Sequence, residues 1–326
     1  LHVYEYISNK CYDQNPRDNT GWTPLHSAAA KGHLDICENI MCKIQNQVPY
    51  DDEGQTPIHL AANKGNLGVF HFFMIVIQDI TQSGYTPLHF AAKEGHLFTC
   101  AYVLDKVVDK NPQDMSGLTP LHLAARYGHL QIFHYMCQYL TDKGKDINPK
   151  TVAGYTPFHF AAKQGQLKIC LDTDTKDPNP TSLGGKTAFH LAAMNGHLLI
   201  CKTIMQKLED KNPQDHNGLT PLHEAAQSGH TKVCKLIMEI VKETKPKNVD
   251  GVIPFHLASY YGHIEVVRYI VENSIDKNPK GTFSCTALHL AARGGHLDIC
   301  KYLVDITEGI IPHDDVGLTP LDYARL

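Results

Sequence analysis

A tetrapeptide of the form Thr-Pro-Leu-His, or a near copy of it, occurs ten times in this chain at an almost constant interval. The copies begin at Thr23, Thr56, Thr86, Thr119, Thr156, Thr187, Thr220, Ile253, Thr286 and Thr319. Successive copies are 33, 30, 33, 37, 31, 33, 33, 33 and 33 residues apart. A period of this length indicates one supersecondary unit stacked on copies of itself. The chain is therefore expected to grow by adding repeats rather than around one globular core.

The repeat from Asp18 to Pro49 predicts a turn followed by a short helix. Residues 18–21 have turn chemistry, and Thr23 is a helix N-cap with Pro24 at the first helical position. Ala28, Ala29 and Ala30 give this helix a slim face that allows close packing, and Gly32 ends it. A second amphipathic helix is expected from about Leu34 to Gln45. Neither helix can bury its apolar side alone, so stability must come mainly from stacking.

Most of the ten cysteines fall at one register position, five residues after a glycine. The members are Cys37, Cys100, Cys170, Cys201, Cys234 and Cys300, and Phe70, Phe133 and Val267 occupy the same position in other repeats. A position that accepts Cys, Phe or Val is a small apolar core position. Reduced, buried thiols and hence an intracellular, cytoplasmic location are predicted.

Three segments of this repeat carry a family resemblance: residues 21–26, Ala28-Ala29 and residues 32–34, with close copies at 117–130 and 218–230. The chain resembles the ankyrin repeat family over essentially its whole length. The resemblance implies an all-α repeat solenoid of helix-turn-helix units with projecting β-hairpin loops. First helices would line a concave face of a curved stack, and second helices would form its convex back.

As one solenoid, the chain would hold a partial repeat at 1–14, nine full repeats from about 18 to 313, and a partial repeat at 314–326. The incomplete ends predict a fragment of a longer protein or degenerate end caps. The second gap is short at 78–83 and the fourth is long near 141–146. An irregular joint is predicted at 165–186, because Thr and Asp are poor helix formers and Pro178 stops a helix.

The 21 histidines suggest metal binding or catalysis until they are placed in register. Nine close the Thr-Pro-Leu-His unit and seven follow the helix-ending glycine, so sixteen are scaffolding. The resemblance implies that the first set forms hydrogen bonds between neighbouring loops. No metal-ligand, phosphate-loop or nucleophile motif is present in the sequence. No catalytic residue, metal or cofactor is therefore predicted.

Charge and hydropathy exclude two further classes of function. The net charge of −4 gives no basic field for nucleic acid. No apolar stretch reaches the roughly 18 residues that a membrane-spanning helix needs, so no direct membrane insertion is expected.

Six Asn-Pro pairs precede the turn, at Asn15, Asn111, Asn148, Asn179, Asn212 and Asn278. They are interpreted as turn initiators, because a residue before proline avoids the helical region. The resemblance leaves one alternative, since asparagines near this loop are hydroxylated in some ankyrin proteins.

Specificity is expected where the repeats differ. Three positions vary: the residue before the N-cap, the residue after the motif histidine, and the pair before the helix-ending glycine. In the first five repeats they carry aromatic and basic side chains, which supply interface energy and steer acidic partners. The predicted partner-binding residues are Trp22, Lys31, Lys64, Tyr85, Phe90, Lys93, Leu118, Arg126, Tyr127, Tyr155, Phe160 and Lys163, with Trp22 the strongest single candidate. The alternative is that the aromatics cover the loop row and the lysines form a solvated face.

The leading hypothesis is a non-enzymatic protein-interaction scaffold that binds an acidic or acidic-hydrophobic segment. The alternative is a cytosolic ankyrin spacer or tether in a larger multidomain or membrane channel protein. A second candidate surface is the convex side, where Phe72, Phe73, Ile75, Val76, Tyr102, Tyr135 and Tyr139 occur. These side chains are expected mostly to pack between second helices, or else to contact the rest of the protein or a second copy.

Overall fold

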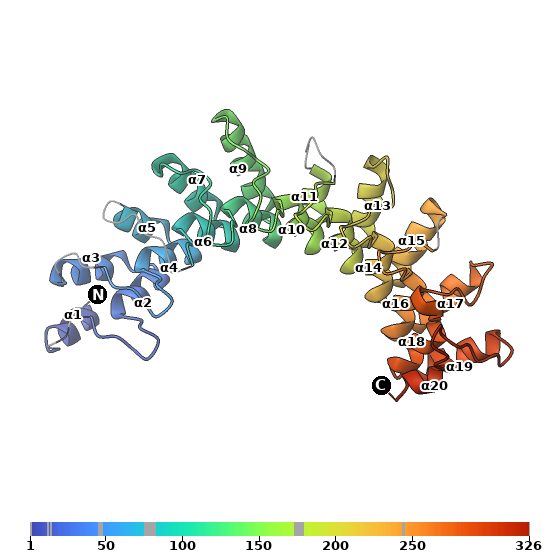
Figure 1. Ribbon diagram of the computed structural model, residues 1–326. Coiled ribbons are helices and arrows are strands. Elements are labelled where there is room, and N and C mark those ends of the chain that lie inside the picture. Colours follow the sequence, from blue (N-terminus) through green and yellow to red (C-terminus); the bar gives the residue numbers. More distant parts are fainter. Residues whose placement is uncertain are drawn as a thin grey trace. The chain divides into compact units, whose positions relative to one another are not determined.

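The computed structural model describes residues 2–11, 13, 15–44, 48–74, 83–172, 179–242 and 245–325. The chain forms two compact units, Leu1–Val152 (unit 1) and Ala153–Leu326 (unit 2), both coloured along the sequence in Figure 1. Unit 1 contains α1 (His2–Ser8), α2 (Pro24–Lys31), α3 (Leu34–Lys43), α4 (Pro57–Lys64), α5 (Leu67–Met74), α6 (Pro87–Glu94), α7 (Leu97–Lys106), α8 (Pro120–Tyr127) and α9 (Leu130–Asp142).

Unit 2 continues the alternation of short first helices and second helices. It contains α10 (Pro157–Lys163), α11 (Leu167–Asp172), α12 (Ala188–Met194), α13 (Leu198–Lys207), α14 (Pro221–Gln227), α15 (Thr231–Val241), α16 (Pro254–Tyr260), α17 (Ile264–Glu272), the 3₁₀ turn η1 (Thr282–Ser284), α18 (Ala287–Arg293), α19 (Leu297–Ile306) and α20 (Pro320–Tyr323). From α2 onward, even-numbered helices are first helices and odd-numbered helices are second helices. The described residues are otherwise irregular, apart from one isolated β-bridge between Thr181 and Thr187. The all-α repeat solenoid is therefore confirmed.

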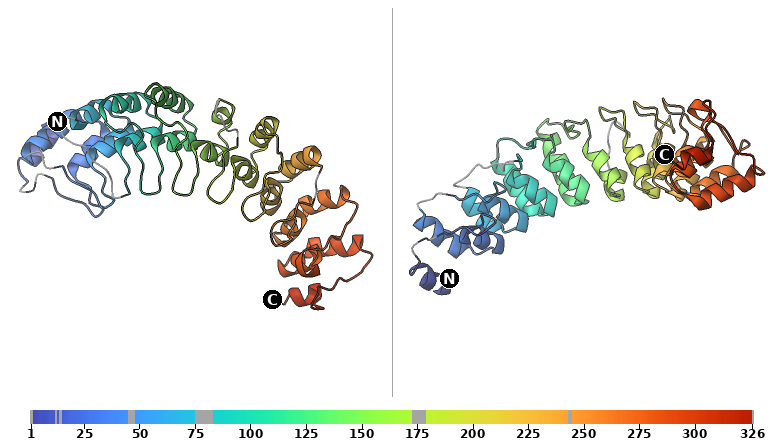
Figure 2. Two further views of the ribbon diagram at one scale, coloured as in Figure 1. Left: turned by 45° about the horizontal axis from the view of Figure 1, so that its top comes forward. Right: turned by 60° about the horizontal axis from the view of Figure 1, so that its bottom comes forward.

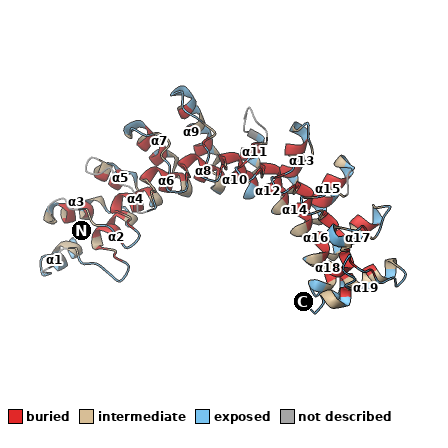
Figure 3. Ribbon diagram, viewed as in Figure 1, coloured by how far each residue is buried: buried red, intermediate tan, exposed pale blue. Residues whose placement is uncertain are grey.

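Each unit is built of two helical layers. In unit 1, α2, α4, α6 and α8 pack in sequence against one another, and each also packs against its own second helix. The same pattern runs from α10 to α20 in unit 2. Buried residues concentrate in the first helices and on the sides of the second helices that face them (Figure 3). The first helices can pack closely because their alanine pairs have small side chains. Among these alanines, Ala61, Ala62, Ala91 and Ala92 are fully buried.

The start and end of each first helix agree with the sequence pattern. Thr23 has an extended backbone, Pro24 follows at the first helical position, and Gly32 has a left-handed φ of 78°. The N-cap bond predicted for Thr23 is found in other repeats, where the hydroxyls of Thr119 and Thr187 accept the His122 and His190 N–H groups at 3.5 and 3.4 Å. The Thr23 hydroxyl instead lies 2.9 Å from His26 Nδ1. Each helix is therefore bounded by residues that the sequence repeats.

The loops before the first helices extend side by side within each unit (Figure 2). In most of the described loops an Asp or Asn side chain closes the turn, as where Asp18 Oδ1 accepts the N–H groups of Thr20 and Trp22 at 2.9 Å, whereas Thr151, Ser182 and Gly281 occupy this position in the others. One backbone bond joins a loop to the next, for example Asp52 N–H to Thr20 O at 3.2 Å. The loops have hairpin turns, but the expected β-hairpins have no named strands among the described residues. Their arms are too short for a ladder because the helix cap follows the turn glycine after one residue.

The Asn-Pro positions have a structural role. Asn15 Oδ1 accepts the Leu25 N–H at 3.1 Å, and Asn179 Oδ1 accepts the Phe189 N–H at 3.2 Å. Each amide therefore satisfies a donor in the first turn of the helix that follows it by about ten residues. The side chains link the loop to the helix as well as starting the turn.

The predicted irregularities fall partly inside the described residues. The helix α11 has six residues and is shorter than the other second helices, as the sequence suggested. Residues 173–178 of the predicted joint, and most of the short link at 78–83, lie outside the described part of the chain. In the sequence, the boundary between the two units falls between Val152 and Ala153 and not in the predicted joint at 165–186. That joint lies within unit 2 and stays a prediction.

One loop lacks the turn glycine. Ser284 stands where other repeats have glycine, and both Phe283 and Ser284 have φ of 56°. A non-glycine residue in this region costs about 1–3 kcal/mol. Gly251, one repeat earlier, has φ of 67°, and a Cβ there would lie 2.6 Å from Thr282 Oγ1.

The Ser284→Gly variant should be more stable than the wild type by about 1 kcal/mol, because relief of strain exceeds the extra entropy of the unfolded chain. Urea unfolding followed by circular dichroism measures the difference. Gly251→Ala is the matched control and should be destabilising. Equal stability of the wild type and Ser284→Gly would contradict a strained loop.

Candidate functional site

The twelve predicted partner-binding residues lie on the first-helix side of the repeats. We call this surface the variable face: the residue before each N-cap, the residue after the motif histidine, and the two residues before the helix-ending glycine. Nine of the twelve belong to unit 1, and Tyr155, Phe160 and Lys163 belong to unit 2.

The first set of histidines fixes the backbone of this face. In α2, the Thr23 N–H donates to His26 Nδ1 at 3.1 Å, so the ring proton must be on Nε2. That proton is donated to a carbonyl in the next repeat. The pairs, at 2.8–3.2 Å, are His26 to Gln55, His89 to Leu118, His159 to Lys186, His190 to Leu219, His223 to Val252, His256 to Pro279 and His289 to Leu318. The inter-loop role predicted for nine motif histidines is confirmed for these seven.

The second set of histidines acts in the opposite direction along the stack. Each is the N-cap of a second helix, and its Nε2 lies 2.7–3.0 Å from a carbonyl in the preceding repeat. The pairs are His96 to Asn63, His129 to Lys93, His197 to Lys163, His230 to Met194, His263 to Gln227 and His296 to Tyr260. Nearly all acceptors in both sets are variable-face residues. The histidines thus hold the main chain at these positions while their side chains vary.

Burial keeps the motif histidines neutral. It lowers the pKa of His89, His190 and His256 to about 4, against the opposing effect of the carbonyl that each ring contacts. A neutral ring suits the observed geometry, because Nδ1 must accept a hydrogen bond. These histidines are scaffold groups with no unused lone pair for acid–base chemistry.

At the start of α6, two aromatic residues of the variable face form one cluster, Tyr85 before the N-cap and Phe90 within the helix. The Tyr85 ring stacks on His89 with centroids 5.0 Å apart, and it meets the Phe90 ring edge-on at 5.6 Å. Phe90 is only 9% exposed, because it also packs against His59 of the preceding repeat at 5.5 Å. Burial raises the pKa of Tyr85. Tyr85 offers the accessible surface of this cluster, and Phe90 supports it from below.

Basic residues gather beside the cluster. Lys93 Nζ lies 5.9 Å from the Tyr127 ring centre, and Arg126 Cζ lies 5.6 Å from it. Tyr127 is 43% exposed, so two cations and an accessible aromatic ring share one area of unit 1. Lys93 Nζ also lies 3.6 Å from the Glu94 carboxylate, which reduces its net charge effect.

The other basic predictions in unit 1 are more isolated. Lys31 and Lys64 are exposed at the ends of α2 and α4. Leu118 is half-buried, and its carbonyl accepts the His89 bond described above. These three residues belong to the variable face but are not among the ring and cation contacts described above.

Unit 2 has a pocket on the same face. It is lined by Tyr155, His159, Phe160, Lys163 and Leu191, and its volume is about 180 Å³. The Tyr155 ring meets His159 edge-on at 5.3 Å and Phe160 at 6.3 Å. The pocket is mostly apolar, and three of its lining residues were predicted from sequence: Tyr155, Phe160 and Lys163.

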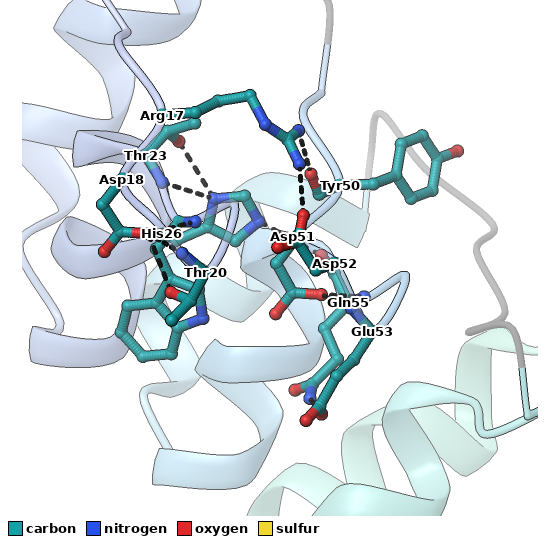
Figure 4. A network of polar contacts seen from close by, with 11 residues as sticks. Arg17, Asp18, Thr20, Thr23, His26, Tyr50, Asp51, Asp52, Glu53 and Gln55 are labelled. Carbon is teal, nitrogen blue, oxygen red and sulfur yellow. Dashed lines mark hydrogen bonds and ion pairs between the residues drawn. The ribbon is translucent and has the colours of Figure 1, made fainter.

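Trp22 lies in a different electrostatic environment. Its ring stacks on His26 at 6.3 Å, and a depression beside it is lined by four carboxylate residues, Asp18, Asp51, Asp52 and Glu53. Figure 4 shows these carboxylates in a network that includes the ion pair of Arg17 with Asp52 at 3.0 Å. Three of the four come from the next loop in the chain. The surroundings of Trp22 are thus acidic rather than basic.

Sequence reasoning gave no role to the pairing of Lys186 and Glu224 at two variable positions. Glu224 is 3% exposed, and its carboxylate accepts a hydrogen bond from Lys186 Nζ at 2.7 Å. Most other repeats have Leu or Phe at the Glu224 position. The sequence signal for this pair was a charged residue at a position that is apolar in most other repeats.

Apolar side chains at the loop tips were also missed. Met115 and Val152 are 78% and 71% exposed in unit 1, and Leu183, Val249 and Phe283 are 70%, 68% and 70% exposed in unit 2. Met115, Val152, Leu183 and Val249 occupy the second turn residue and Phe283 occupies the third, and folding leaves both positions in solvent. The sequence signal for these exposed side chains was an apolar residue flanked by turn-forming residues.

The second-helix surface behaves largely as predicted. Phe73 is fully buried, Tyr102 packs on Phe70 with centroids 6.3 Å apart, and Tyr139 donates a hydrogen bond to Leu104 O at 2.8 Å. Ile75 and Val76 lie outside the described residues. Phe98 is an exception to this packing, since it is 80% exposed on α7.

The chemistry that this arrangement can perform is recognition. Within the described ranges, no group of three or more His, Cys, Asp or Glu side chains could hold a metal ion. Over the same residues, no helix combines the length and apolar character that crossing a membrane requires. Accessible aromatic and cationic side chains on a fixed backbone are suited to binding protein segments.

Comparison with known proteins agrees with the repeat architecture. The family model "Ankyrin repeats (3 copies)" matches overlapping segments that together cover residues 2–325. The comparison with curated proteins gave no match to this chain.

The buried histidines should make unfolding sensitive to acid. Their pKa is about 4 in the folded chain and about 6.5 when unfolded, so unfolded chains bind more protons between these values. The stabilisation is complete above about pH 6.5 and is lost as the pH falls toward 4. Between pH 7 and pH 5, each of the three should cost roughly 2 kcal/mol, measurable by urea unfolding.

A His190→Gln variant provides the control for this pH effect. It should be less stable than the wild type at pH 7, and it should lose less stability on going to pH 5. The same pH dependence in both proteins would show that His190 is not held neutral.

Lys186→Met should destabilise unit 2 by about 3 kcal/mol, because it leaves the Glu224 carboxylate buried without its cation. The double variant Lys186→Met with Glu224→Leu should recover most of this loss, since leucine occupies the Glu224 position in several repeats. Urea unfolding measures both. Additive losses in the double variant would contradict a coupled pair.

Proposed function

This chain belongs to the ankyrin repeat family, and we propose that it is a non-enzymatic scaffold that binds a partner protein through its variable face. Ankyrin repeats are generally protein–protein interaction modules, and proteins built from them are typically non-enzymatic. One observation carries the proposal. The histidines hold the main chain of the repeats by hydrogen bonds, and the neighbouring side chains are accessible and differ between repeats.

The partner is an acidic-hydrophobic protein segment. Aromatic surface is supplied by Tyr85 and Tyr127 in unit 1 and by Tyr155 in unit 2. Cationic groups lie beside these rings, as the contacts of Lys93 and Arg126 with Tyr127 show. Aromatic residues contribute most of the energy of interfaces, and cations steer acidic partners toward them.

The charge around Trp22 restricts where the acidic part of the partner can bind. The carboxylates of Asp18, Asp51, Asp52 and Glu53 line the depression beside this ring. A carboxylate of the partner would be repelled there, so we place acidic groups of the partner against Lys93 and Arg126 in unit 1 and, separately, against Lys163 in unit 2. The portion that meets Trp22 is neutral or basic.

An intracellular, cytoplasmic location accompanies this proposal. Burial raises the pKa of the Cys37, Cys100, Cys201 and Cys234 thiols to about 12, so they stay protonated at neutral pH. Protonated, buried thiols are poor nucleophiles and serve as core residues. Such a core requires no disulfide and suits a reducing compartment.

A partner captured by a photocrosslinker on the variable face should lose about 2 kcal/mol of binding free energy when Tyr85 is changed to Ala, the scale of an interface hot spot. The double variant Lys93→Glu with Arg126→Glu should mainly slow association and weaken its salt dependence. Surface plasmon resonance resolves affinity and association rate.

Phe98→Ala is the matched control, because Phe98 is an exposed aromatic residue in the same repeat as Tyr85 but on α7. It should leave affinity unchanged within about 0.5 kcal/mol. If Phe98→Ala weakens binding and Tyr85→Ala does not, the partner binds the second-helix side and the proposed face is wrong.

A further inference from the structure

Two repeats share a combination of variable-face residues that the others lack. Their sequences are Gly-Tyr-Thr-Pro-Leu-His-Phe-Ala-Ala-Lys at 84–93 and Gly-Tyr-Thr-Pro-Phe-His-Phe-Ala-Ala-Lys at 154–163. Both copies have Tyr before the N-cap, Phe after the histidine and Lys two residues before glycine, and they differ in the residue directly before glycine, which is Glu94 or Gln164. No other repeat combines these three residues, although every repeat shares the scaffold. The agreement therefore concerns side chains that the fold leaves open to change.

The two copies pair the same rings in their own units, although Tyr85 stacks on His89 at an interplanar angle of 16° and Tyr155 meets His159 edge-on at 76°. In unit 1, Tyr85 contacts His89 and Phe90 with ring centres 5.0 and 5.6 Å apart. In unit 2, Tyr155 contacts His159 and Phe160 at 5.3 and 6.3 Å. Each copy thus joins a half-buried tyrosine to the motif histidine and to a phenylalanine. The lysine follows one turn later at the end of the same helix.

The unit 2 copy shows what such a cluster can hold. Its pocket of about 180 Å³ is lined by apolar and aromatic groups and by Lys163. An apolar cavity of about 150 Å³ is large enough for benzene, so this pocket accepts one phenyl ring. Lys163 is exposed and provides a cation for a carboxylate next to that ring. The unit 1 copy has Lys93 with Arg126 in the following helix.

We propose that these two segments are two binding sites of one specificity, each of which accepts an aromatic side chain flanked by a carboxylate from a partner protein. The inference rests on the proposed function and adds the class of side chain bound and the number of sites per chain. The Tyr and Phe rings surround the aromatic group, and the lysine pairs with the carboxylate. The sites differ in the groups around the lysine, because Lys93 has Glu94 at 3.6 Å and Arg126 in the following helix, whereas neutral Gln164 follows Lys163.

The test uses the full chain and the peptide acetyl-Glu-Phe-Glu-amide as the probe, followed by amide and methyl NMR. We expect saturable shifts at two places, residues 84–93 and residues 154–163, with the Leu191 methyl groups moving alongside the second set. Acetyl-Lys-Phe-Lys-amide should shift neither set, because its charges oppose the lysines. Shifts at one segment only, or equal shifts with both peptides, would overturn the proposal.

Substitutions that other repeats already tolerate keep the fold intact. Tyr155→Gln copies Gln55, and Lys163→Gln copies Gln227. Tyr155→Gln should weaken the peptide at least tenfold in unit 2 and leave the shifts at 84–93 unchanged. Lys163→Gln should weaken it about threefold, the scale of an exposed ion pair. Loss of both sets of shifts on changing Tyr155 alone would contradict two separate sites.

The outcome is distinguishable from failure of the proposed function. If a partner protein depends on Tyr85 but the peptide shifts neither segment, the scaffold function stands and the duplicated sites are rejected. If the peptide binds both segments while the partner depends only on Phe98, the sites exist and the partner assignment fails.

Discussion

The hydrogen bond from a histidine ring to the main chain of a neighbouring repeat is the interaction on which this structure depends. A stack of short helices must be coupled laterally, because no single repeat buries enough apolar surface to fold alone. His26 and its equivalents bond forward to the next repeat, and His96 and its equivalents bond backward. Both sets use carbonyl groups, which every residue possesses. The coupling therefore places no demand on the side chains at the acceptor positions.

Because the side chains at the acceptor positions are free to vary, one short repeat can stabilise the stack and also carry the side chains that we propose bind a partner. The backbone of Lys93 is held by His129, while its side chain lies near Tyr127. The backbone of Lys163 is held by His197, while its side chain lines a pocket. The proposed binding groups are presented on a fixed main chain, so less conformational entropy is lost when a partner binds. The same design admits Glu224 at a position that is apolar in most repeats, provided that Lys186 pairs with it.

Much of the fold could be predicted from the sequence because its determinants are local. Thr23, Pro24 and Gly32 act within one helix, and their roles follow from backbone geometry alone. The core position of Cys37 follows from helical periodicity, and its side chain is fully buried. The bonds of the first set of histidines between neighbouring loops were also expected, but through the family resemblance rather than from residue chemistry, and the backward bonds of the second set were not predicted.

The electrostatics and accessibility of the site could not be predicted in this way, because they arise between repeats. Phe90 is largely covered by contacts that include His59, and the carboxylates near Trp22 come mainly from the following loop. Neither arrangement can be found by comparing the residues that occupy the same position in different repeats. The most direct test of the central claim is imidazole ¹⁵N NMR of the native chain at pH 6. We predict that His89, His190 and His256 are neutral, carry their proton on Nε2 and exchange it slowly with solvent. Protonated or mixed-tautomer rings at this pH would contradict the account.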